Sequence, residues 1–265
     1  MNISLKSKSS IVTGAAGGFG KAATKALLLA GTSVVACDVN DSMLEECYRE
    51  LSPLGNLQRF SCDLTDPNAA KQLVQKAVDA HGGLDILVNN AGIMDRFDSI
   101  VDVDMDFWDR VIATNLTAPS RLSKCAVQEF LRGDETQNAE GAKSSRGIIV
   151  NVGSINGFRG GLSGVAYTTA KHGLVGLTRN TAAFYSNKGI RCNIIMPGVM
   201  KTNIQSAYKF GVNEEARNLS RKLAEVNPGA VELDKLAKMV VWACSDDADY
   251  LSGAIISADY GWQAM

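Results

Sequence analysis

The chain has 265 residues, of which 46% are hydrophobic and 21% are charged. This profile is typical of one large globular α/β domain, or two small ones, that buries a sizeable core. Because 27 Lys and Arg nearly balance 28 Asp and Glu, the formal charge is −1, which argues against binding to nucleic acid or to an anionic membrane.

The chain start and the cysteines narrow the class of protein further. Residues 1–6 contain no long apolar run, so we expect neither a signal peptide nor a membrane anchor. No stretch reaches the roughly 18 unbroken apolar residues of a membrane helix. The six Cys are scattered, without a Cys-x-x-Cys pair, and only two His are present. We therefore expect no metal site, and a reducing cytoplasmic compartment.

A glycine-rich turn follows the first predicted strand, Ser9–Thr13, and leads into a predicted helix over residues 21–30. Glycines at a strand-to-helix turn let the backbone approach a ligand closely, and the free N–H groups of a helix start suit a pyrophosphate. The spacing Gly-x-x-x-Gly-x-Gly differs from the commoner Gly-x-Gly-x-x-Gly. We predict a dinucleotide site here, formed by Gly14, Gly17, Gly18, Phe19 and Gly20.

The second predicted strand, residues 32–37, ends on Asp38, which lies 18 residues beyond Gly20 (38 minus 20). A spacing of about 20 is expected for the acid that binds the adenosine ribose. A carboxylate repels a 2′-phosphate, and no Arg or Lys stands at 15–17 or 39–40 to hold one. We predict NAD(H) as the cofactor, with NADP(H) less favoured. The alternative for Asp38 is a helix cap, a role that Asp41 fills better.

Residues 57–62 and 85–88 are the third and fourth predicted strands, with a helix beginning at Asp66 between them. The fourth is almost wholly apolar, as a parallel strand buried on both faces should be. It ends in Asn89-Asn90-Ala91-Gly92, which suits the floor of a crevice at the carboxyl edge of an open sheet. A polar turn is the alternative.

A long helix is predicted from residue 104 to residue 131, and it contains Asn115 and, four positions later, Pro119. Proline has no N–H, so the carbonyl of Asn115 loses its helical partner and the helix should bend there. A freed carbonyl beside a polar side chain can hold an ordered water. The alternative is a proline that the helix merely tolerates.

Residues 133–146 are polar and aperiodic, which predicts a surface insert rather than a domain boundary. The fifth predicted strand, residues 148–152, follows and delivers Ser154 at its carboxyl end. Ser154 precedes Tyr167 by 13 residues (167 minus 154), a loop short enough to bring the two together. A lone Ser in this place is more often a turn residue.

The last part of the chain predicts two more strands, at residues 192–196 and 254–257, and a helix at 232–244. Between them, residues 199–227 are irregular and partly helical. We predict that this segment covers a pocket and moves over a substrate.

Tyr167 and Lys171 lie four positions apart at the start of a predicted helix, so both side chains leave the same helical face. A nearby ammonium favours phenolate, and we therefore expect Lys171 to lower the pKa of Tyr167 from about 10 toward neutrality. A phenol with such a pKa is a usable acid and base. A surface Tyr-Lys pair would be the alternative if this motif stood alone.

Together these residues resemble the short-chain dehydrogenase/reductase family over essentially the whole chain. The motifs occur in the family's order and spacing: Thr13-Gly14-x-x-x-Gly18-Phe19-Gly20, Asp63, Asn89-Asn90-Ala91-Gly92, Asn115, Ser154, Tyr167-x-x-x-Lys171, and Pro197-Gly198 with Thr202. The resemblance implies a single-domain Rossmann fold over residues 1–265, with a doubly wound parallel sheet of about seven strands flanked by helices. It also implies a homodimer or homotetramer, with its interface at the helices around Asn115 and Tyr167 and at the C-terminal tail.

The family resemblance implies roles for the catalytic residues. Tyr167 would be the general acid/base, Lys171 would lower the pKa of Tyr167 and hold the nicotinamide ribose, and Ser154 would hydrogen-bond the substrate oxygen. Asn115 would hold a water in a proton relay to Lys171.

The resemblance also assigns cofactor contacts: Asp63 and Leu64 to adenine, Asn90 to the adenosine end, and Met200 and Thr202 to the carboxamide. Three departures from the family pattern are Phe19 in place of Ile or Leu, Gly153 in place of a second Ser, and the 133–146 insert.

The sequence therefore predicts an oxidoreductase that transfers a hydride between NAD(H) and a secondary alcohol or ketone. The alternatives are a non-redox epimerase or dehydratase on the same fold, and a dinucleotide-binding sensor or scaffold without turnover. The substrate would be a small molecule, and an apolar pocket mildly favours a neutral hydrophobic or polyol-like one. Besides Ser154, its candidate lining residues are Met94, Ile155, Phe158, Tyr208, Phe210 and Trp262.

Overall fold

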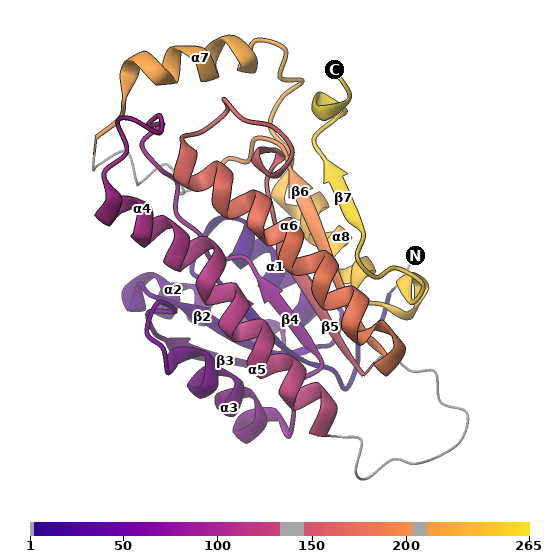
Figure 1. Cartoon of the computed structure of the whole chain (residues 1–265). Coiled ribbons are helices and arrows are strands. Elements are labelled where there is room, and N and C mark those ends of the chain that lie inside the picture. Colours follow the sequence, from indigo (N-terminus) through magenta and orange to yellow (C-terminus); the bar gives the residue numbers. More distant parts are fainter. Residues whose placement is uncertain (1–2, 133–145, 203–210) are drawn as a thin grey trace.

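The computed structural model describes residues 3–132, 146–202 and 211–265. In these residues a single sheet of seven parallel strands, in the order β3-β2-β1-β4-β5-β6-β7, runs through the molecule. Helices cover both faces of the sheet (Figure 1). The predicted doubly wound Rossmann-type fold is confirmed.

Each strand corresponds to a predicted one, with ends that differ by at most two residues. The strands are β1 (Ser9–Thr13), β2 (Ser33–Asp38), β3 (Leu57–Ser61), β4 (Ile86–Asn89), β5 (Gly147–Val152), β6 (Ile190–Pro197) and β7 (Ile255–Ala258). Strands β1, β4, β5 and β6 are buried along their whole length. Since both faces of the sheet are covered, apolar residues occur on both faces of these strands instead of alternating with exposed polar ones.

The helices divide into two layers, each with its own core. They are α1 (Gly18–Leu29), α2 (Asp41–Leu51), α3 (Ala69–His81), α4 (Met105–Ile112), α5 (Ala118–Arg132), α6 (Val165–Tyr185), α7 (Glu214–Ala224) and α8 (Leu233–Ala243). On one face, α1, α2 and α8 pack on Val12 and its neighbours. On the other, α3, α5 and the end of α6 pack on Ile11. Successive residues of β1 thus enter opposite cores, as strand geometry requires.

The predicted helix from 104 to 131 is interrupted where Asn115 and Pro119 predicted a bend. A π-helical turn, Ala113–Thr117, separates α4 from α5, and the N–H of Ala118 donates to the carbonyl of Ala113. The ring of Pro119 supplies no N–H to a regular helical ladder. Such π-turns are frequent at functional sites, and this one carries the buried Asn115.

Beyond β6 the chain crosses the carboxyl edge of the sheet, where Met200 pairs with Val231 in an isolated bridge. Helix α7 lies over this edge (Figure 1) and is held at its start by Asn213, whose N–H donates to the carbonyl of Arg96 at 2.8 Å. The hydroxyl of Ser220 donates to the carbonyl of Leu162 at 3.1 Å. Residues 203–210 of the predicted substrate segment, and 133–145 of the predicted insert, lie outside the described residues.

Gly153 departs from the family pattern for a reason that only packing reveals. A Cβ placed on Gly153 would overlap the Met196 sulfur and lie 2.9 Å from the Ile194 Cδ1. Both side chains belong to the neighbouring strand β6. The larger residues on β6 therefore require glycine at the end of β5, immediately before Ser154.

Among the helices of the described chain, none is long and apolar enough to cross a membrane.

Candidate active site

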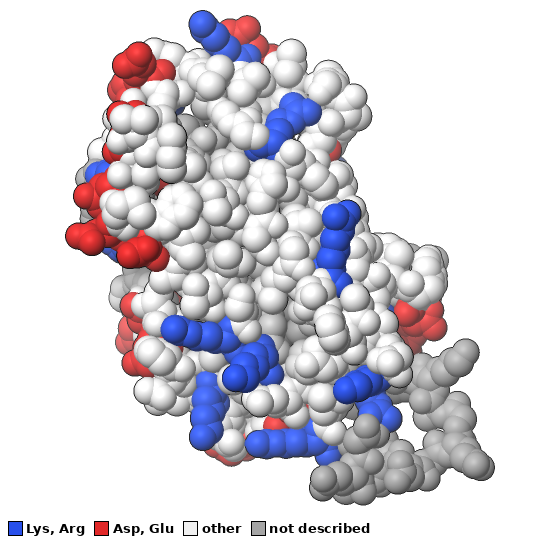
Figure 2. Space-filling view, in the orientation of Figure 1, with Lys and Arg blue, Asp and Glu red and all other residues white. Residues whose placement is uncertain are grey.

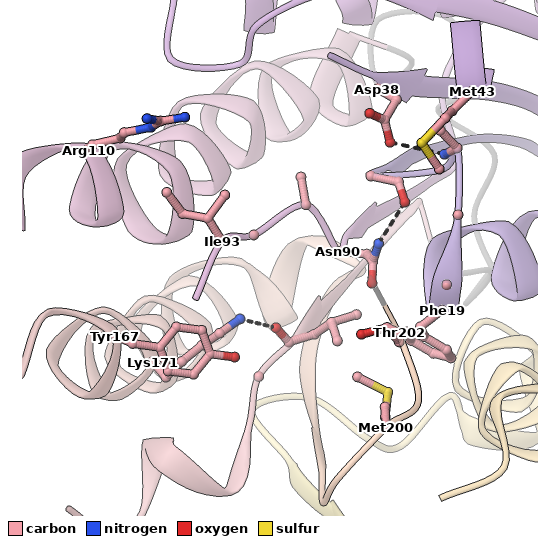
Figure 3. Close-up of a pocket in the computed structure, with 18 of the residues that line it drawn as sticks. Phe19, Asp38, Met43, Asn90, Ile93, Arg110, Tyr167, Lys171, Met200 and Thr202 are labelled. Carbon is pink, nitrogen blue, oxygen red and sulfur yellow. Dashed lines mark hydrogen bonds between the residues drawn. The ribbon is translucent and has the colours of Figure 1, made fainter. Parts of the chain in front are cut away.

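A cavity of about 310 Å³ opens at the carboxyl edge of the sheet (Figure 3). Parallel strands all end at this edge, so the segments that follow β1, β2, β4, β5 and β6 meet there. One end of the cavity is formed by the glycine-rich turn and Asp38, and the other by Tyr167 and Lys171. Two predicted groups of residues, far apart in the chain, thus share one site.

The glycine-rich turn needs glycine at three of its positions. Gly14 and Gly18 have φ of +63° and +51°, a region that side chains disfavour. A Cβ on Gly20 would overlap the carbonyl oxygen of Gly14. Asn90 holds the turn from β4, because its Nδ2 donates to the carbonyls of Thr13 (2.9 Å) and Gly14 (3.2 Å).

Helix α1 begins at this turn with Gly17 as its N-cap, which has no side chain to cap the first turn, and no acidic residue occurs in that turn. The first N–H groups and the positive end of the helix dipole therefore face the cavity without a competing carboxylate from α1. This arrangement fits a phosphate group.

Asp38 ends β2 at the edge of the cavity. Its Oδ2 accepts from the N–H of Ala16 at 3.0 Å, and its Oδ1 accepts from the N–H of Asn40 at 3.0 Å. Each carboxylate oxygen has further lone pairs. The side chain is thereby oriented by the turn on one side and by the start of α2 on the other, while it can still accept hydrogen bonds from a ligand.

Tyr167 and Lys171 leave the same face of α6 and point into the cavity (Figure 3). Lys171 is 4% exposed, and its Nζ donates to the carbonyl of Val152 on β5 at 2.9 Å. This Nζ lies 5.5 Å from the centroid of the Tyr167 ring. Ser154 lies close enough to the Tyr167 phenol to lower its pKa by hydrogen bonding. Ser154 and Lys171, which were predicted to act with Tyr167, therefore both lie beside this phenol.

The expected pKa of the phenol is wrong for this structure. The pKa of Tyr167 is raised to about 12: burial is the largest cause, hydrogen bonding with Ser154 opposes the rise, and the charge of Asp95 adds to it. Burial also lowers the pKa of Lys171 to about 8. Both changes have the same cause, because a group removed from water favours its uncharged form. The Lys171 ammonium donates its hydrogen bond to the carbonyl of Val152 rather than to the phenol oxygen of Tyr167.

Asp95 is a functional residue that the sequence did not reveal. Its carboxylate is 3% exposed and accepts three backbone N–H groups, from Phe97 (3.2 Å), Gly164 (2.8 Å) and Tyr167 (2.9 Å). It thus caps the start of α6 from a distant segment. Burial raises the pKa of the Asp95 carboxyl, and the bonds from Tyr167, Gly164 and Phe97 oppose that shift. Nothing in the local sequence pairs residue 95 with a helix 70 residues away.

Asn115 uses its side chain to hold the segment after β4. Its Oδ1 accepts from the N–H of Ile93, and its Nδ2 donates to the carbonyl of Ile93, both at 2.8 Å. The side chain is 1% exposed and does not line the cavity. The structure thus gives the Asn115 amide an anchoring role. Its predicted part in a water relay stays a prediction.

Two predicted adenine contacts do not line the cavity. Asp63 is exposed, and its Oδ1 accepts from both the N–H and the hydroxyl of Thr65 at 2.8 Å. Leu64 is half-buried against the core below α3 and α5. Their contact with adenine stays a prediction. Met200 and Thr202, by contrast, do line the cavity, and their contact with the carboxamide stays a prediction.

The predicted substrate residues are dispersed. Ile155 packs with Leu162 and Trp262 in a separate buried cluster, and Phe158 is 43% exposed. Met94 packs against the cluster that contains Tyr167. Tyr208 and Phe210 lie outside the described residues.

The lining residues that the sequence analysis missed include three from helices: Met43 of α2, and Phe107 and Arg110 of α4. They belong to no motif. Their helices face the cavity only because of the way the layers pack, which helical periodicity alone cannot specify.

Comparison with known proteins identifies what this chain is similar to. Residues 8–211 match the model of the short chain dehydrogenase family. The chain is 41% identical to a short chain dehydrogenase/reductase, dpchG, of Colletotrichum higginsianum, over 98% of this chain and 96% of that protein. It is 33% identical to 3beta-hydroxysteroid dehydrogenase 2 of Eggerthella lenta, over 98% and 96%.

Among solved structures, a putative NAD(P) dependent gluconate 5-dehydrogenase from Beutenbergia cavernae superposes with a TM-score of 0.82. The two sequences are 28% identical, and the match covers 99% of each chain. That structure was solved with bound NADP at low occupancy.

The depressed pKa of Lys171 makes this residue costly for stability. At pH 7 the side chain is charged in both folded and unfolded protein, and a shift from 10.5 to about 8 corresponds to about 3 kcal/mol. We expect Lys171→Met to raise the free energy of unfolding at pH 7, by this amount less the cost of the Val152 hydrogen bond. The gain should shrink as pH rises from 8 to 10.5, where Lys171 loses its proton in the folded state.

Urea denaturation at several pH values measures this effect, with Lys188→Met as the control because Lys188 is exposed. A gain from Lys171→Met that is the same at pH 7 and pH 10 would contradict the burial of a charged amine.

Proposed function

This chain belongs to the short-chain dehydrogenase/reductase family and is an oxidoreductase that acts on alcohols or ketones; from that premise we propose that it transfers a hydride between NAD(H) and a secondary alcohol or ketone, with Tyr167 as the general acid/base. The observation that supports this most directly is the shared cavity. Ser154 is not among the lining residues, but it lies beside Tyr167, which is. The proton-handling residues stand at one end, and a phosphate-binding turn with a carboxylate stands at the other.

The cavity fits a nicotinamide dinucleotide. The glycine-rich turn excludes side chains and presents the uncapped N–H groups of α1, which suits the pyrophosphate. Asp38 would accept from the ribose hydroxyls, and Lys171, Met200 and Thr202 would border the nicotinamide end. The dinucleotide supplies the hydride chemistry when it is bound.

The protein's own residues supply the proton and the polarisation. With a pKa of about 12, Tyr167 is protonated at neutral pH and can give its proton to the oxygen of a ketone. Ser154 donates a hydrogen bond toward the same place and stabilises charge that develops there. Lys171, whose pKa is about 8, is the nearby group that can exchange protons near neutrality. In alcohol oxidation Tyr167 would first give up its own proton, with Lys171 as the nearby group that can exchange it, and the resulting phenolate would accept the proton of the alcohol.

We expect Tyr167→Phe to remove nearly all turnover, because the ring remains but the exchangeable proton is lost. Loss of a general acid/base lowers kcat by roughly 10²- to 10⁴-fold. Binding of NADH, measured by fluorescence, should stay nearly unchanged. Tyr250→Phe, at a residue that is 75% exposed, is the matched control.

The assay follows the absorbance of NADH over a panel of alcohols and ketones. It also separates the proposal from an epimerase or dehydratase, which would convert substrate without net change in NADH, and from a sensor, which would bind NADH only. Substantial activity in Tyr167→Phe would end the assignment of this residue.

Asp38 supports NAD(H) over NADP(H), because its oriented carboxylate would meet a 2′-phosphate with like charge. We expect Asp38→Ala or Asp38→Ser to relax the preference, lowering the ratio of kcat/KM with NAD+ to that with NADP+ on the order of tenfold, or about 1.4 kcal/mol. Asp41→Ala is the control, since Asp41 is a neighbouring carboxylate paired with Arg59. A wild-type protein that already favours NADPH would refute this role of Asp38.

We further propose that the chain forms a homo-oligomer through α5 and α6. The centre of the face that these helices present in Figure 1 is largely uncharged in Figure 2, and Phe184 of α6 is 65% exposed. Sedimentation should show a dimer or tetramer, and Phe184→Asp should dissociate it. Leu29→Asp, at a residue of α1 that is 64% exposed on the opposite layer, should not. A monomeric wild-type protein would contradict the proposal.

A further inference from the structure

Asn156 gives two hydrogen bonds, one from its backbone and one from its side chain, to one hydroxyl. Its backbone N–H donates to the Oγ of Ser154 at 3.2 Å, and its Nδ2 donates to the same oxygen at 3.0 Å. A hydroxyl oxygen has two lone pairs and one hydrogen. With both lone pairs occupied, the remaining hydrogen-bonding capacity of Ser154 is donation of its own hydrogen.

The Asn156 amide makes a second contact through its oxygen. Its Oδ1 accepts from the hydroxyl of Ser163 at 2.9 Å. Since Ser163 has a single proton and gives it to Asn156, the hydroxyl of Thr168, 2.9 Å away, must donate to Ser163. Asn156 is 6% exposed and Ser163 is 9% exposed, so water competes little for these bonds. Thr168 directly follows Tyr167, so the chain of bonds begins and ends at the first turns of α6.

We propose that Asn156 is a positioning residue that makes Ser154 a dedicated hydrogen-bond donor toward the reacting oxygen. The proposal rests on the proposed oxidoreductase function. If the amide were reversed, its oxygen would face Ser154, and the Ser154 hydrogen would turn to that oxygen and away from Tyr167. The identity and orientation of residue 156 therefore decide whether Ser154 can polarise a carbonyl.

A purely structural role is the competing explanation, because Ser154 is also the N-cap of a short 3₁₀ turn, Ile155–Gly157. The two explanations differ in what happens when the side chain of residue 156 keeps its shape but loses its donor.

Asn156→Asp makes that change. The ionised carboxylate has the same size as the amide and still accepts from Ser163, but it donates nothing and would draw the Ser154 hydrogen toward itself. We expect kcat for ketone reduction to fall roughly 100-fold at pH 8, as for the loss of one donor in an oxyanion-type site. The KM for NADH should be unchanged.

The pH profile separates positioning from structure. As the introduced carboxyl becomes protonated at mildly acidic pH, its O–H can donate to Ser154 again, so the activity of Asn156→Asp relative to wild type should rise as pH falls. Asn156→Ala has no such group, and its loss of activity should be the same at every pH. Ser163→Ala keeps the donor of Asn156 and should lose less activity than either.

Ser154→Ala completes the test. If Asn156 acts through Ser154, combining Asn156→Asp or Asn156→Ala with Ser154→Ala should add almost no further loss. The Ala variants provide this test even if the Asp variant does not fold, as judged by its thermal transition and NADH binding. Full additivity, or an unchanged kcat in a folded Asn156 variant, would overturn the proposal. A wild-type protein that binds NADH but turns over no alcohol or ketone would instead refute the proposed function.

Discussion

The buried carboxylate of Asp95 holds the start of α6 against the segment that follows β4, and the rest of the site depends on this contact. Two of its backbone bonds, from Gly164 and Tyr167, fix the first turn of the helix that carries Tyr167 and Lys171, and the third, from Phe97, holds its own segment. The same segment is held from the other side by Asn115, which takes both the N–H and the carbonyl of Ile93. These hydrogen bonds hold the irregular segment after β4 in a fixed position relative to α6.

Removal from water decides the chemistry of the groups held there. Tyr167 and Lys171 are both buried, and their pKa values move in opposite directions toward the uncharged forms. The result is a phenol that keeps its proton at neutral pH next to an amine that exchanges one near neutrality. This arrangement costs stability, because within the described chain a charged amine is kept in the interior with a hydrogen bond to a single carbonyl, that of Val152, and with the Tyr167 ring beside it.

The parallel sheet explains why residues from five separate segments meet. Every strand ends at the same edge, so the glycine-rich turn after β1, Asp38 after β2 and Ser154 after β5 arrive together. Packing beneath that edge then restricts what the chain can carry there. Gly153 precedes Ser154 because Met196 and Ile194 fill the space of a side chain, and Asn156 follows it in a turn tight enough to reach back to its hydroxyl.

The sequence by itself determined the seven strands, the helices around them, the glycine-rich turn and the Ser154, Tyr167 and Lys171 group. Apolar runs, helical periodicity and motif spacing are properties of neighbouring residues in the chain, so they can be recognised in the sequence alone. Only the tertiary structure decided the pKa values of Tyr167 and Lys171, the π-turn at Asn115, the trans cap by Asp95 and the direction of the Asn156 amide. Each of these depends on how much water is excluded, or on which distant backbone groups come within hydrogen-bond distance, and neither quantity is a function of nearby residues in the chain.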